Sequence, residues 1–504
     1  MRSPISIAFY STCLENSPRI GKLGDQNQKA IYQLVSCINF QEPPLINRRK
    51  FLLSSSSAFA LTQLPSNVYA KNGIQHYKLV AEAAEHIFYP NAQKSKLSLY
   101  NQQSPGPTIH AVKGDILEVD FLNLLDEPTT IHWHGIRNLN EMDGVPGLTQ
   151  PAVEPGETFT YRFPLKDTGL FWYHAHTQAW KQVTKGLYGP LLVRDVNDET
   201  HHRDVLLVLD DWLLDDNEQL QLDSLGSLHD WSHGGRHGNF LTVNGQSKPN
   251  IAVPSNGQCK LRFLSATNAR VMKFELNKKI PMKIIAIDGS PCAPFAVEKL
   301  TVAPAQRYDI LVEDSSQLEE LIEVSTSERL MAASFSTTKN TQVKYGTNPL
   351  HRPWYPLPQT THAKIIDIHM QGGAMGNLAS AVFEGEEKSL RDLAQNDAKL
   401  WAFNGEIGGY GLALADIALG DTVILRVWND TRWRHAMHLH GQHFWVNSKE
   451  FGEQNRQVLR DTYLMQPSEK VDLIFTADNP GLWLFHCHML EHHASGMGGV
   501  ISVT

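Results

Sequence analysis

His486-Cys487-His488 opens the stretch that decides the fold of this chain, and the stretch continues to His492 and Met497. A cysteine with a histidine five residues later and a methionine ten residues later supplies the thiolate, the imidazole and the weak axial thioether of a blue-copper site. Neighbouring side chains of a strand face opposite ways, so His486 and His488 point away from the metal that Cys487 would bind. The stretch therefore predicts two metal centres joined by short covalent paths.

Three more paired-histidine motifs occur earlier in the chain. They are His132-Trp133-His134, His174-Ala175-His176 and His438-Leu439-His440, with His435 three residues before the last pair. Each pair can present two imidazoles on one face of a strand. The four pairs together offer eight imidazoles, too many for one ion, and a structural zinc site closes with four ligands. The pairs therefore predict a copper cluster, with His435 and His492 left to complete the site of Cys487 and Met497.

These four motifs, in this order, resemble the multicopper oxidases, a family that includes laccases, bacterial cuprous oxidases and bilirubin oxidases. The resemblance covers nearly all of the chain after residue 75, including Gly106-Pro107-Thr108-Ile109, Pro155-Gly156-Glu157 and Trp172-Tyr173-His174. It implies four copper ions per chain. It implies His132 and His438 as ligands of the type 2 copper; His134, His174, His176, His440, His486 and His488 as ligands of the type 3 pair; and His435, Cys487, His492 and Met497 as ligands of the type 1 copper.

The resemblance also implies a reaction. A reducing substrate would lose single electrons to the type 1 copper. Cys487, His486 and His488 would pass them to the trinuclear cluster, where dioxygen takes four electrons and becomes water. All twelve ligand positions hold the expected residues. This disfavours the alternative of another class, a copper-free or copper-storing envelope protein with the same fold.

The methionine content bears on the electron donor. Cuprous oxidases of this family often carry methionine-rich insertions, because soft thioethers suit copper(I). This chain has 11 methionines and no such cluster. We therefore expect a laccase-like oxidation of phenols or aromatic amines, with a periplasmic cuprous oxidase of copper tolerance as the alternative. Asp430, five residues before His435, could bind a donor proton or could be a plain turn residue.

The reaction also consumes protons, and Asp143 is the first candidate to handle them. It lies eleven residues after His132, where the family places a carboxylate near the type 2 copper. We expect it to orient a water molecule or relay protons, although Asp143-Gly144 is also a turn signal. Several bacterial members have a second acid directly after the last type 1 histidine, and this chain has His493 there. His493, Glu491 or a different path would then carry protons.

Three further histidines fall at four-residue spacing, His229, His233 and His237. On a helix they would share a face and could bind a metal ion. Gly234 and Gly235 interrupt such a helix, so a loop is the expected structure.

The chain after residue 70 has the pattern of an all-β protein. Short alternating apolar runs, such as those at 116–121, 205–209 and 422–427, are separated by Gly, Pro, Asn and Asp, which is typical of β-sandwiches. The best candidate for a helix is 384–395. The resemblance implies three consecutive cupredoxin-like Greek-key β-sandwich domains. The expected boundaries are 75–195 with the first two histidine pairs, 203–335 without ligands, a linker at 336–364, and 365–504 with the remaining ligands.

Residues 1–70 do not fit this pattern. Arg48-Arg49-Lys50 begins a twin-arginine motif, an apolar serine-rich stretch follows, and Val68-Tyr69-Ala70 offers a signal-peptidase site. We expect export of the folded protein to the periplasm or out of the cell, and no membrane span after cleavage. The segment before Arg48 is long for a signal sequence, and translation from a start downstream of Met1 is one hypothesis for it.

The net charge of −8 argues against nucleic acid and anionic membranes as partners. The expected partners are dioxygen and a small donor molecule, and the expected state is a monomer. Of the five cysteines, Cys259 and Cys292 could form a disulfide in an oxidising compartment or stay as two buried thiols.

Overall fold

The computed structural model describes residues 73–196, 204–255, 257–338, 352–451 and 456–504. The predicted signal segment therefore lies outside the described residues. Strands dominate the described part, and its helices are single short turns, none long and apolar enough to cross a membrane. They are η1 (Asn140–Met142), α2 (Ala179–Gln182), α3 (Leu228–Ser232), η3 (Asn277–Lys279), η4 (Ser315–Gln317), α4 (Leu390–Asp392), η5 (Leu393–Asp397) and α5 (Leu490–Ala494).

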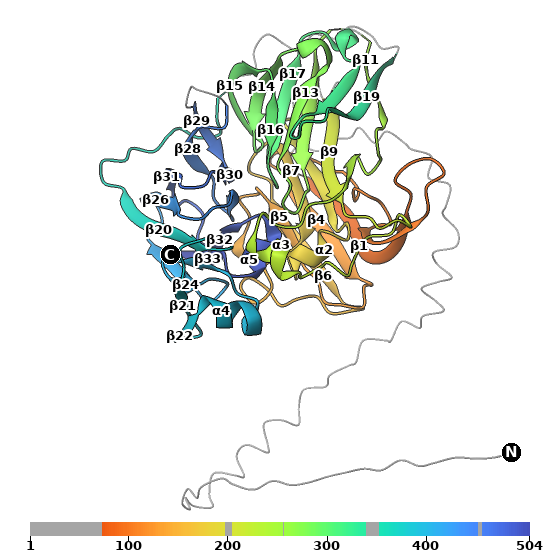
Figure 1. The fold of residues 1–504 in the computed structure, drawn as a ribbon. Coiled ribbons are helices and arrows are strands. Elements are labelled where there is room, and N and C mark those ends of the chain that lie inside the picture. Colours follow the sequence, from red (N-terminus) through yellow and green to blue (C-terminus); the bar gives the residue numbers. More distant parts are fainter. Residues whose placement is uncertain (1–72, 197–203, 256, 339–351, 452–455) are drawn as a thin grey trace, which may run out of the picture. The chain divides into compact units, whose positions relative to one another are not determined.

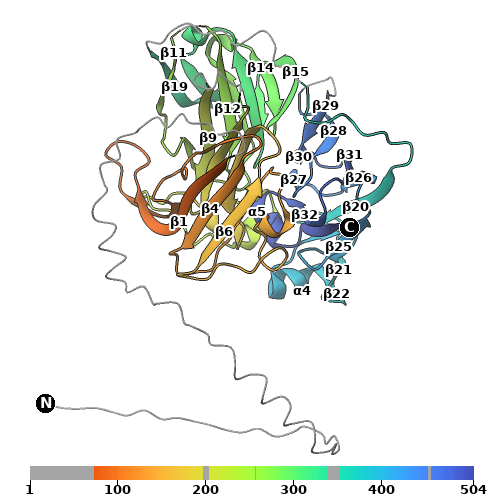
Figure 2. The ribbon, with the colours of Figure 1, turned by 180° about the vertical axis from the view of Figure 1, so that it is seen from behind.

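The strands form three consecutive cupredoxin-like sandwiches, each of two sheets (Figures 1 and 2). In the first sandwich the sheet orders are β2-β1-β4-β6 and β3-β8-β7-β5. Its strands are β1 (Ile74–His86), β2 (Ser95–Tyr100), β3 (Ile109–Val112), β4 (Ile116–Asn123), β5 (Ile131–His134), β6 (Thr158–Pro164), β7 (Gly169–Ala175) and β8 (Tyr188–Arg194).

The second sandwich has sheets in the orders β10-β9-β12-β17-β14-β15 and β11-β19-β18-β13-β16. Its strands are β9 (Asp204–Trp212), β10 (Phe240–Val243), β11 (Asn250–Pro254), β12 (Cys259–Ser265), β13 (Met272–Leu276), β14 (Met282–Ile287), β15 (Ser290–Val297), β16 (Leu300–Val302), β17 (Arg307–Val312), β18 (Glu320–Glu323) and β19 (Leu330–Thr338).

The third sandwich has sheets in the orders β22-β21-β24-β23-β20-β26-β31-β28-β29 and β25-β33-β32-β27-β30. Its strands are β20 (Lys364–Gly372), β21 (Ser380–Phe383), β22 (Glu386–Ser389), β23 (Trp401–Phe403), β24 (Glu406–Ile407), β25 (Ala413–Ile417), β26 (Thr422–Asn429), β27 (His435–Leu439), β28 (Phe444–Ser448), β29 (Arg456–Arg460), β30 (Thr462–Met465), β31 (Lys470–Thr476), β32 (Gly481–Cys487) and β33 (Gly498–Val503).

The three predicted apolar runs lie in strands β4, β9 and β26. The alternation of buried and more exposed residues is clear in β4, whereas the run in β9 is buried on both faces. In β4, Leu117, Val119 and Phe121 are buried, because alternate residues of a strand share a face. They join one core cluster with Trp133 and Tyr173 of the opposite sheet. Packing of this kind turns two one-sided sheets into a sandwich.

The predicted helix at 384–395 is wrong in its first half. Residues Glu386–Ser389 form β22 and pair with β21, and helical turns begin only at Leu390. Ser389 ends the strand and caps the helix, because its side chain accepts a hydrogen bond from the backbone N–H of Asp392 (3.1 Å).

Candidate metal centre

The paired histidines stand on neighbouring strands of the first and third sandwiches. His132 on β5 lies directly across from His174 on β7, and His438 on β27 lies across from His486 on β32. These strands converge beside α5 (Figures 1 and 2). The rings of His132 and His440 stack with their centroids 3.8 Å apart. The first and third sandwiches therefore meet at the histidines.

The predicted ligands gather into compact groups whose ligand atoms lie within 4.8 Å of one another. The groups are His134, His174 and His488; His176, His440 and His486; His132, His134 and His438; and His435, Cys487 and His492. All of these residues are buried. Each of the first three groups takes residues from both the first and the third sandwich. The structure thus brings together eleven of the twelve sequence-predicted ligands, and Met497 is buried with its backbone carbonyl accepting from the N–H of Cys487 (3.0 Å).

Hydrogen bonds to the protein fix how the imidazoles of the cluster point. The bonds run from His132 Nδ1 to the Asp143 carbonyl (2.8 Å), His174 Nδ1 to the Ala175 carbonyl (3.0 Å), His438 Nδ1 to the Asp461 carbonyl (2.8 Å), His440 Nδ1 to the Asp143 carboxylate (2.8 Å), His486 Nδ1 to the Cys487 carbonyl (3.0 Å) and His134 Nε2 to the Asp461 carboxylate (3.1 Å). Such bonds set the tautomer and leave the other ring nitrogen as the acceptor atom.

Several ring nitrogens of the cluster are buried without a hydrogen-bond partner in the described chain. They are His132 Nε2, His134 Nδ1, His176 Nε2 and His438 Nε2. A buried polar atom left unpaired costs about 1–3 kcal/mol, and native proteins rarely leave several of them together. Metal ions between the rings would satisfy these lone pairs. Imidazole is a donor that suits copper, so the residues fit the metal that the motifs predict.

Burial keeps the imidazoles in the neutral form that binds metal. It lowers the pKa well below the ordinary value for His134, His174, His176, His440, His486 and His488. Burial also lowers the pKa of His438 to about 3, although Asp461 opposes the shift. It raises the pKa of the Cys487 thiol, so a bound metal ion would have to displace the thiol proton.

The group around Cys487 forms a separate centre with its own supports. Cys487 Sγ lies 3.5 Å from His435 Nδ1 and 3.7 Å from His492 Nδ1. The ring nitrogens that face away from Cys487 form hydrogen bonds with the protein. His435 Nε2 contacts Thr431 Oγ1 (2.8 Å), and His492 Nε2 contacts the carbonyl of His233 (2.8 Å). One thiolate and two imidazoles are the three strong donors of a blue-copper site.

Asp143 lies in the histidine cluster and also forms a turn, so its two predicted interpretations are compatible. It belongs to a group with His132 and His440, all buried. Gly144 has φ +82°, and a Cβ there would lie 1.8 Å from the carbonyl oxygen of Ile131. Only glycine can take this conformation at such close range. The turn therefore holds Asp143 close to β5, where its carboxylate accepts a hydrogen bond from His440 Nδ1.

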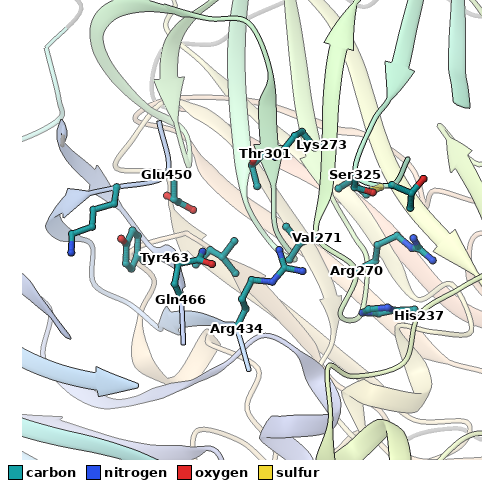
Figure 3. A pocket seen from close by; sticks show the side chains of 14 residues that line it. His237, Arg270, Val271, Lys273, Thr301, Ser325, Arg434, Glu450, Tyr463 and Gln466 are labelled. Atoms are coloured by element: carbon teal, nitrogen blue, oxygen red, sulfur yellow. The ribbon is translucent and has the colours of Figure 1, made fainter. Parts of the chain in front are cut away.

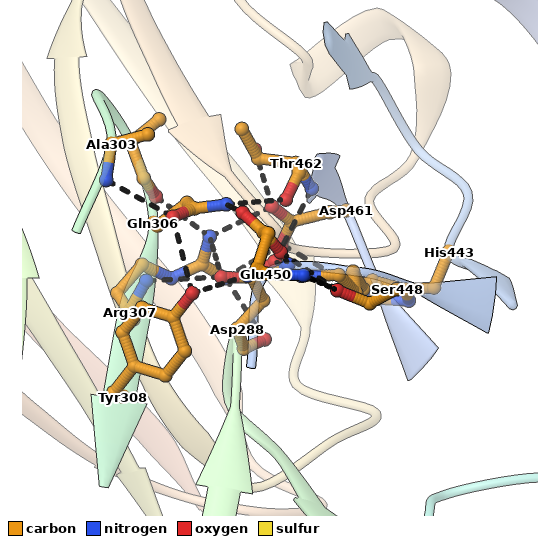
Figure 4. Close-up of polar contacts among 12 residues, drawn as sticks. Asp288, Ala303, Gln306, Arg307, Tyr308, His443, Ser448, Glu450, Asp461 and Thr462 are labelled. Carbon is orange, nitrogen blue, oxygen red and sulfur yellow. Dashed lines mark hydrogen bonds and ion pairs between the residues drawn. The ribbon is translucent and has the colours of Figure 1, made fainter. Parts of the chain in front are cut away.

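Asp461 supports the cluster, and the sequence patterns did not identify it. Its side chain is fully buried and contacts His134, and its carboxylate accepts from Arg307 Nη1 (2.8 Å) and Nη2 (2.6 Å). Arg307 also donates to the carbonyls of Leu170 (3.1 Å) in the first sandwich and Asp288 (3.0 Å) in the second. Figure 4 shows Asp461 and Arg307 among the residues of this polar network. One guanidinium thus ties all three sandwiches to a histidine of the cluster.

His493, rather than Glu491, lies beside the cluster. The ring of His493 is 4.3 Å from that of His486, measured between centroids. Glu491 points toward the second sandwich, where its carboxylate accepts from Asn268 Nδ2 (3.3 Å). Burial raises the pKa of Glu491 to about 7.

The other sequence candidates lie outside the two centres. Asp430 pairs with His369 (3.0 Å). His229 belongs to α3, so the predicted loop is wrong there, and its ring lies 4.1 Å from that of His233. His237 follows beyond the helix. Cys259 and Cys292 are buried and are not joined by a disulfide.

Comparisons with known proteins agree with these centres. Three family models, all described as multicopper oxidase, match residues 82–198, 203–344 and 384–504. The chain is 28% identical to multicopper oxidase MmcO of Mycobacterium tuberculosis, over 79% of this chain and 81% of that protein. It is 26% identical to Laccase-1 of Cryptococcus neoformans, over 82% of this chain and 78% of that protein.

Two solved structures are also similar. A multi-copper oxidase from Pseudomonas thermotolerans gives a TM-score of 0.69 at 27% identity, with 86% of this chain and 99% of that chain covered. A multicopper oxidase from Campylobacter jejuni, described as a metallo-oxidase, gives a TM-score of 0.70 at 27% identity, with 87% and 93% covered. The chain therefore belongs to the multicopper oxidase family, and it is a copper-dependent oxidoreductase that takes dioxygen as its electron acceptor.

Proposed function

We propose that this chain holds four copper ions and oxidises phenols or aromatic amines in single-electron steps while dioxygen is reduced to water. The observation that carries the proposal is the pair of separate buried centres, one with Cys487 and one with the paired histidines. In the second centre, the inner nitrogens of His132, His134, His176 and His438 have no partner in the described chain. When bound, copper supplies a one-electron acceptor at the first centre and the dioxygen-reducing chemistry at the second.

The proposed division of the ligands is supported by the groups of buried histidine and cysteine side chains, and Met497, which belongs to no group, is assigned from the family resemblance. His435, Cys487, His492 and Met497 hold the type 1 ion, and His132 and His438 hold the type 2 ion. The two type 3 ions take His134, His174 and His488, and His176, His440 and His486. This division is supported by the fact that each triad is compact and buried.

The residues of the chain connect and protect the two centres. Cys487 is bonded through the backbone to His486 and His488, so the path between the centres is covalent. All three side chains are buried, which separates the histidine cluster from a bulky organic donor at the Cys487 centre. The Asp143 carboxylate accepts a hydrogen bond from Nδ1–H of His440, and we assign it the transfer of protons at that nitrogen. His493 stands beside His486 as a second candidate.

The proposal also covers the location of the protein and its oligomeric state. The twin-arginine motif at Arg48 and Arg49 supports export of a folded protein to the periplasm or the medium, and we propose that the exported protein is a monomer. A periplasmic cuprous oxidase is the second candidate function, supported by the likeness to the Campylobacter jejuni metallo-oxidase.

Copper content and oxygen uptake test the proposal together. We expect about four copper ions per chain, an intense blue band, and oxygen uptake driven faster by 2,6-dimethoxyphenol than by copper(I). Faster uptake with copper(I) would favour the cuprous oxidase. Copper binding without oxygen uptake from either donor would refute the oxidase assignment and leave a copper-storing protein.

Asp143→Asn tests the proton role. The amide keeps the shape of the side chain and removes its charge, so steady-state oxygen uptake should fall about 10–100-fold, the usual loss for a residue that supports a metal ligand or moves protons. The blue band should stay bleached during turnover, because electrons enter normally and leave slowly. Asp478→Asn, a change in an exposed partner of Arg137, is the control. Normal uptake by Asp143→Asn would contradict the role.

A further inference from the structure

A cavity lies where the second and third sandwiches meet, directly over the Cys487 centre. Its two adjoining chambers, of about 480 and 410 Å³, share the lining residues His237, Arg434 and Gln466. Figure 3 shows Arg434 extending from the third sandwich toward Val271 and Arg270 of the second. Both chambers open to solvent, so a small molecule can enter.

Three residues of the cavity lining are close neighbours of the three strong ligands of the Cys487 centre. Arg434 immediately precedes the ligand His435. Met489 lines the smaller chamber, and its N–H lies 3.4 Å from Cys487 Sγ. Gly234 lines the same chamber and follows the residue whose carbonyl accepts from His492. A donor in this chamber would therefore lie beside close neighbours of all three strong ligands.

The lining of the cavity is strongly basic. Its charged residues are Arg270, Lys273, Arg432, Arg434, Lys449 and a single acid, Glu450. Glu450 forms an ion pair with Arg460 and accepts a hydrogen bond from Gln306 Nε2 (2.9 Å). Arg270 forms an ion pair with Asp211 (2.9 Å). In the described part of the chain, the other four basic side chains have no carboxylate within 4.0 Å. The cavity therefore carries uncompensated positive charge beside the point where electrons enter.

The lining also offers a surface for an aromatic ring. Trp433 is half-buried and lines the smaller chamber together with Met489. The indole N–H of Trp433 donates to the carbonyl of Ala374 (3.0 Å), which fixes the ring in place. Aromatic and thioether side chains contact aromatic ligands favourably.

We propose that the electron donor is an anionic aromatic molecule, a phenol that bears a carboxylate, whose ring lies against Trp433 and whose carboxylate is bound by Arg434. Lys273 and Lys449 add long-range attraction. This inference rests on the proposed oxidase function and names its substrate class. Each of four donors loses one electron and its phenolic proton, and one dioxygen takes up four electrons and four protons to give two waters. A cationic donor such as copper(I) is repelled by the same charges.

A matched pair of donors tests this specificity. 4-Hydroxy-3,5-dimethoxybenzoate and its methyl ester share a ring and differ in charge. We expect Arg434→Gln to lower the ratio of kcat/KM for the acid over the ester by about tenfold, because a charge-assisted hydrogen bond is lost. The ratio cancels any common change in the copper centre. Arg391→Gln, which removes an exposed charge outside the cavity, should leave the ratio unchanged.

Binding gives a second readout that needs no turnover. Titration of the copper-loaded enzyme with 4-methoxybenzoate and 4-methoxybenzamide, followed by calorimetry, should show tighter binding of the carboxylate, weakened by salt. Arg434 is next to the metal ligand His435, so Arg434→Gln could fold poorly. In that case the double variant Lys273→Gln/Lys449→Gln, which changes two exposed residues, provides the same comparison of acid and ester. An unchanged acid-to-ester ratio in the variants, or equal binding of acid and amide, would overturn the inference. Absence of any donor oxidation by the loaded wild type would instead refute the oxidase function, while the binding comparison still decides the anionic site.

Discussion

Cys487→Ser is expected to abolish the blue absorption and donor oxidation together while the histidine cluster still binds copper. The thiolate is the one donor of the first centre that the chain cannot replace, and a serine hydroxyl is a hard, weakly acidic substitute. Changes in residues that only support a ligand typically cost about 10–100-fold, so loss of the ligand itself should cost more than about a hundredfold. Cys487 also starts the covalent path to His486 and His488.

Three measurements separate this result from simple misfolding. The visible spectrum reports the Cys487 centre, copper analysis should show one ion fewer than in the wild type, and oxygen uptake reports turnover. Cys292→Ser is a matched control, since Cys292 is also a buried thiol, with its pKa raised by burial to about 12, and it lies in no metal-binding group of the described residues. A blue band that survives in Cys487→Ser would refute the assignment.

Asp461→Asn should destabilise the protein and loosen copper at the same time. The change leaves the Arg307 guanidinium buried with its main carboxylate partner gone, and breaking a buried ion pair in this way costs about 3–5 kcal/mol. It also weakens the support of His134, so copper affinity should fall about 10–100-fold. Thermal unfolding and copper analysis at neutral pH measure the two effects.

The comparison is made at neutral pH because Asp461 must be charged there to stabilise the fold. Burial acts to raise its pKa, and Arg307 more than offsets burial, so the pKa is about 2. The unfolded value is about 3.9. The carboxylate therefore stabilises the fold fully above about pH 4, and this stabilisation is lost as the pH falls toward 2. Variant and wild type should differ most at neutral pH.

Asp472→Asn is the matched control for Asp461→Asn. Asp472 also forms a two-point contact with an arginine, Arg426, but the two side chains are 39% and 47% exposed. An exposed pair of this kind contributes about 0–1 kcal/mol. Equal losses in the two variants would mean that burial of the Arg307 network has no special importance.

The sequence was sufficient for the histidine and cysteine centres because their ligands follow strand periodicity. Residues two apart on β5, such as His132 and His134, share a face, and adjacent strands then bring the pairs together. The sequence pattern predicts one helix over 384–395 and misses β22, because that strand depends on its pairing with β21. Ser389 ends the strand and caps the helical turn that follows through one local hydrogen bond.

The remaining features depend on contacts between distant parts of the chain. Arg307 and Asp461 are 154 residues apart and carry no shared motif. The basic lining of the donor cavity could not be predicted from the sequence either, because the net charge of −8 is a property of the whole chain. Only the meeting of the second and third sandwiches concentrates that charge beside His435.

The division of the ligands between the first and third sandwiches also bears on biosynthesis. Each triad of the histidine cluster is incomplete in either sandwich alone: His134 and His174 need His488, and His176 needs His440 and His486. A truncated or half-folded chain therefore offers at most two-histidine fragments of these sites. The complete cluster therefore forms only when the first and third sandwiches have docked, so a chain without the strand that carries His486 and His488 should not bind copper at these triads.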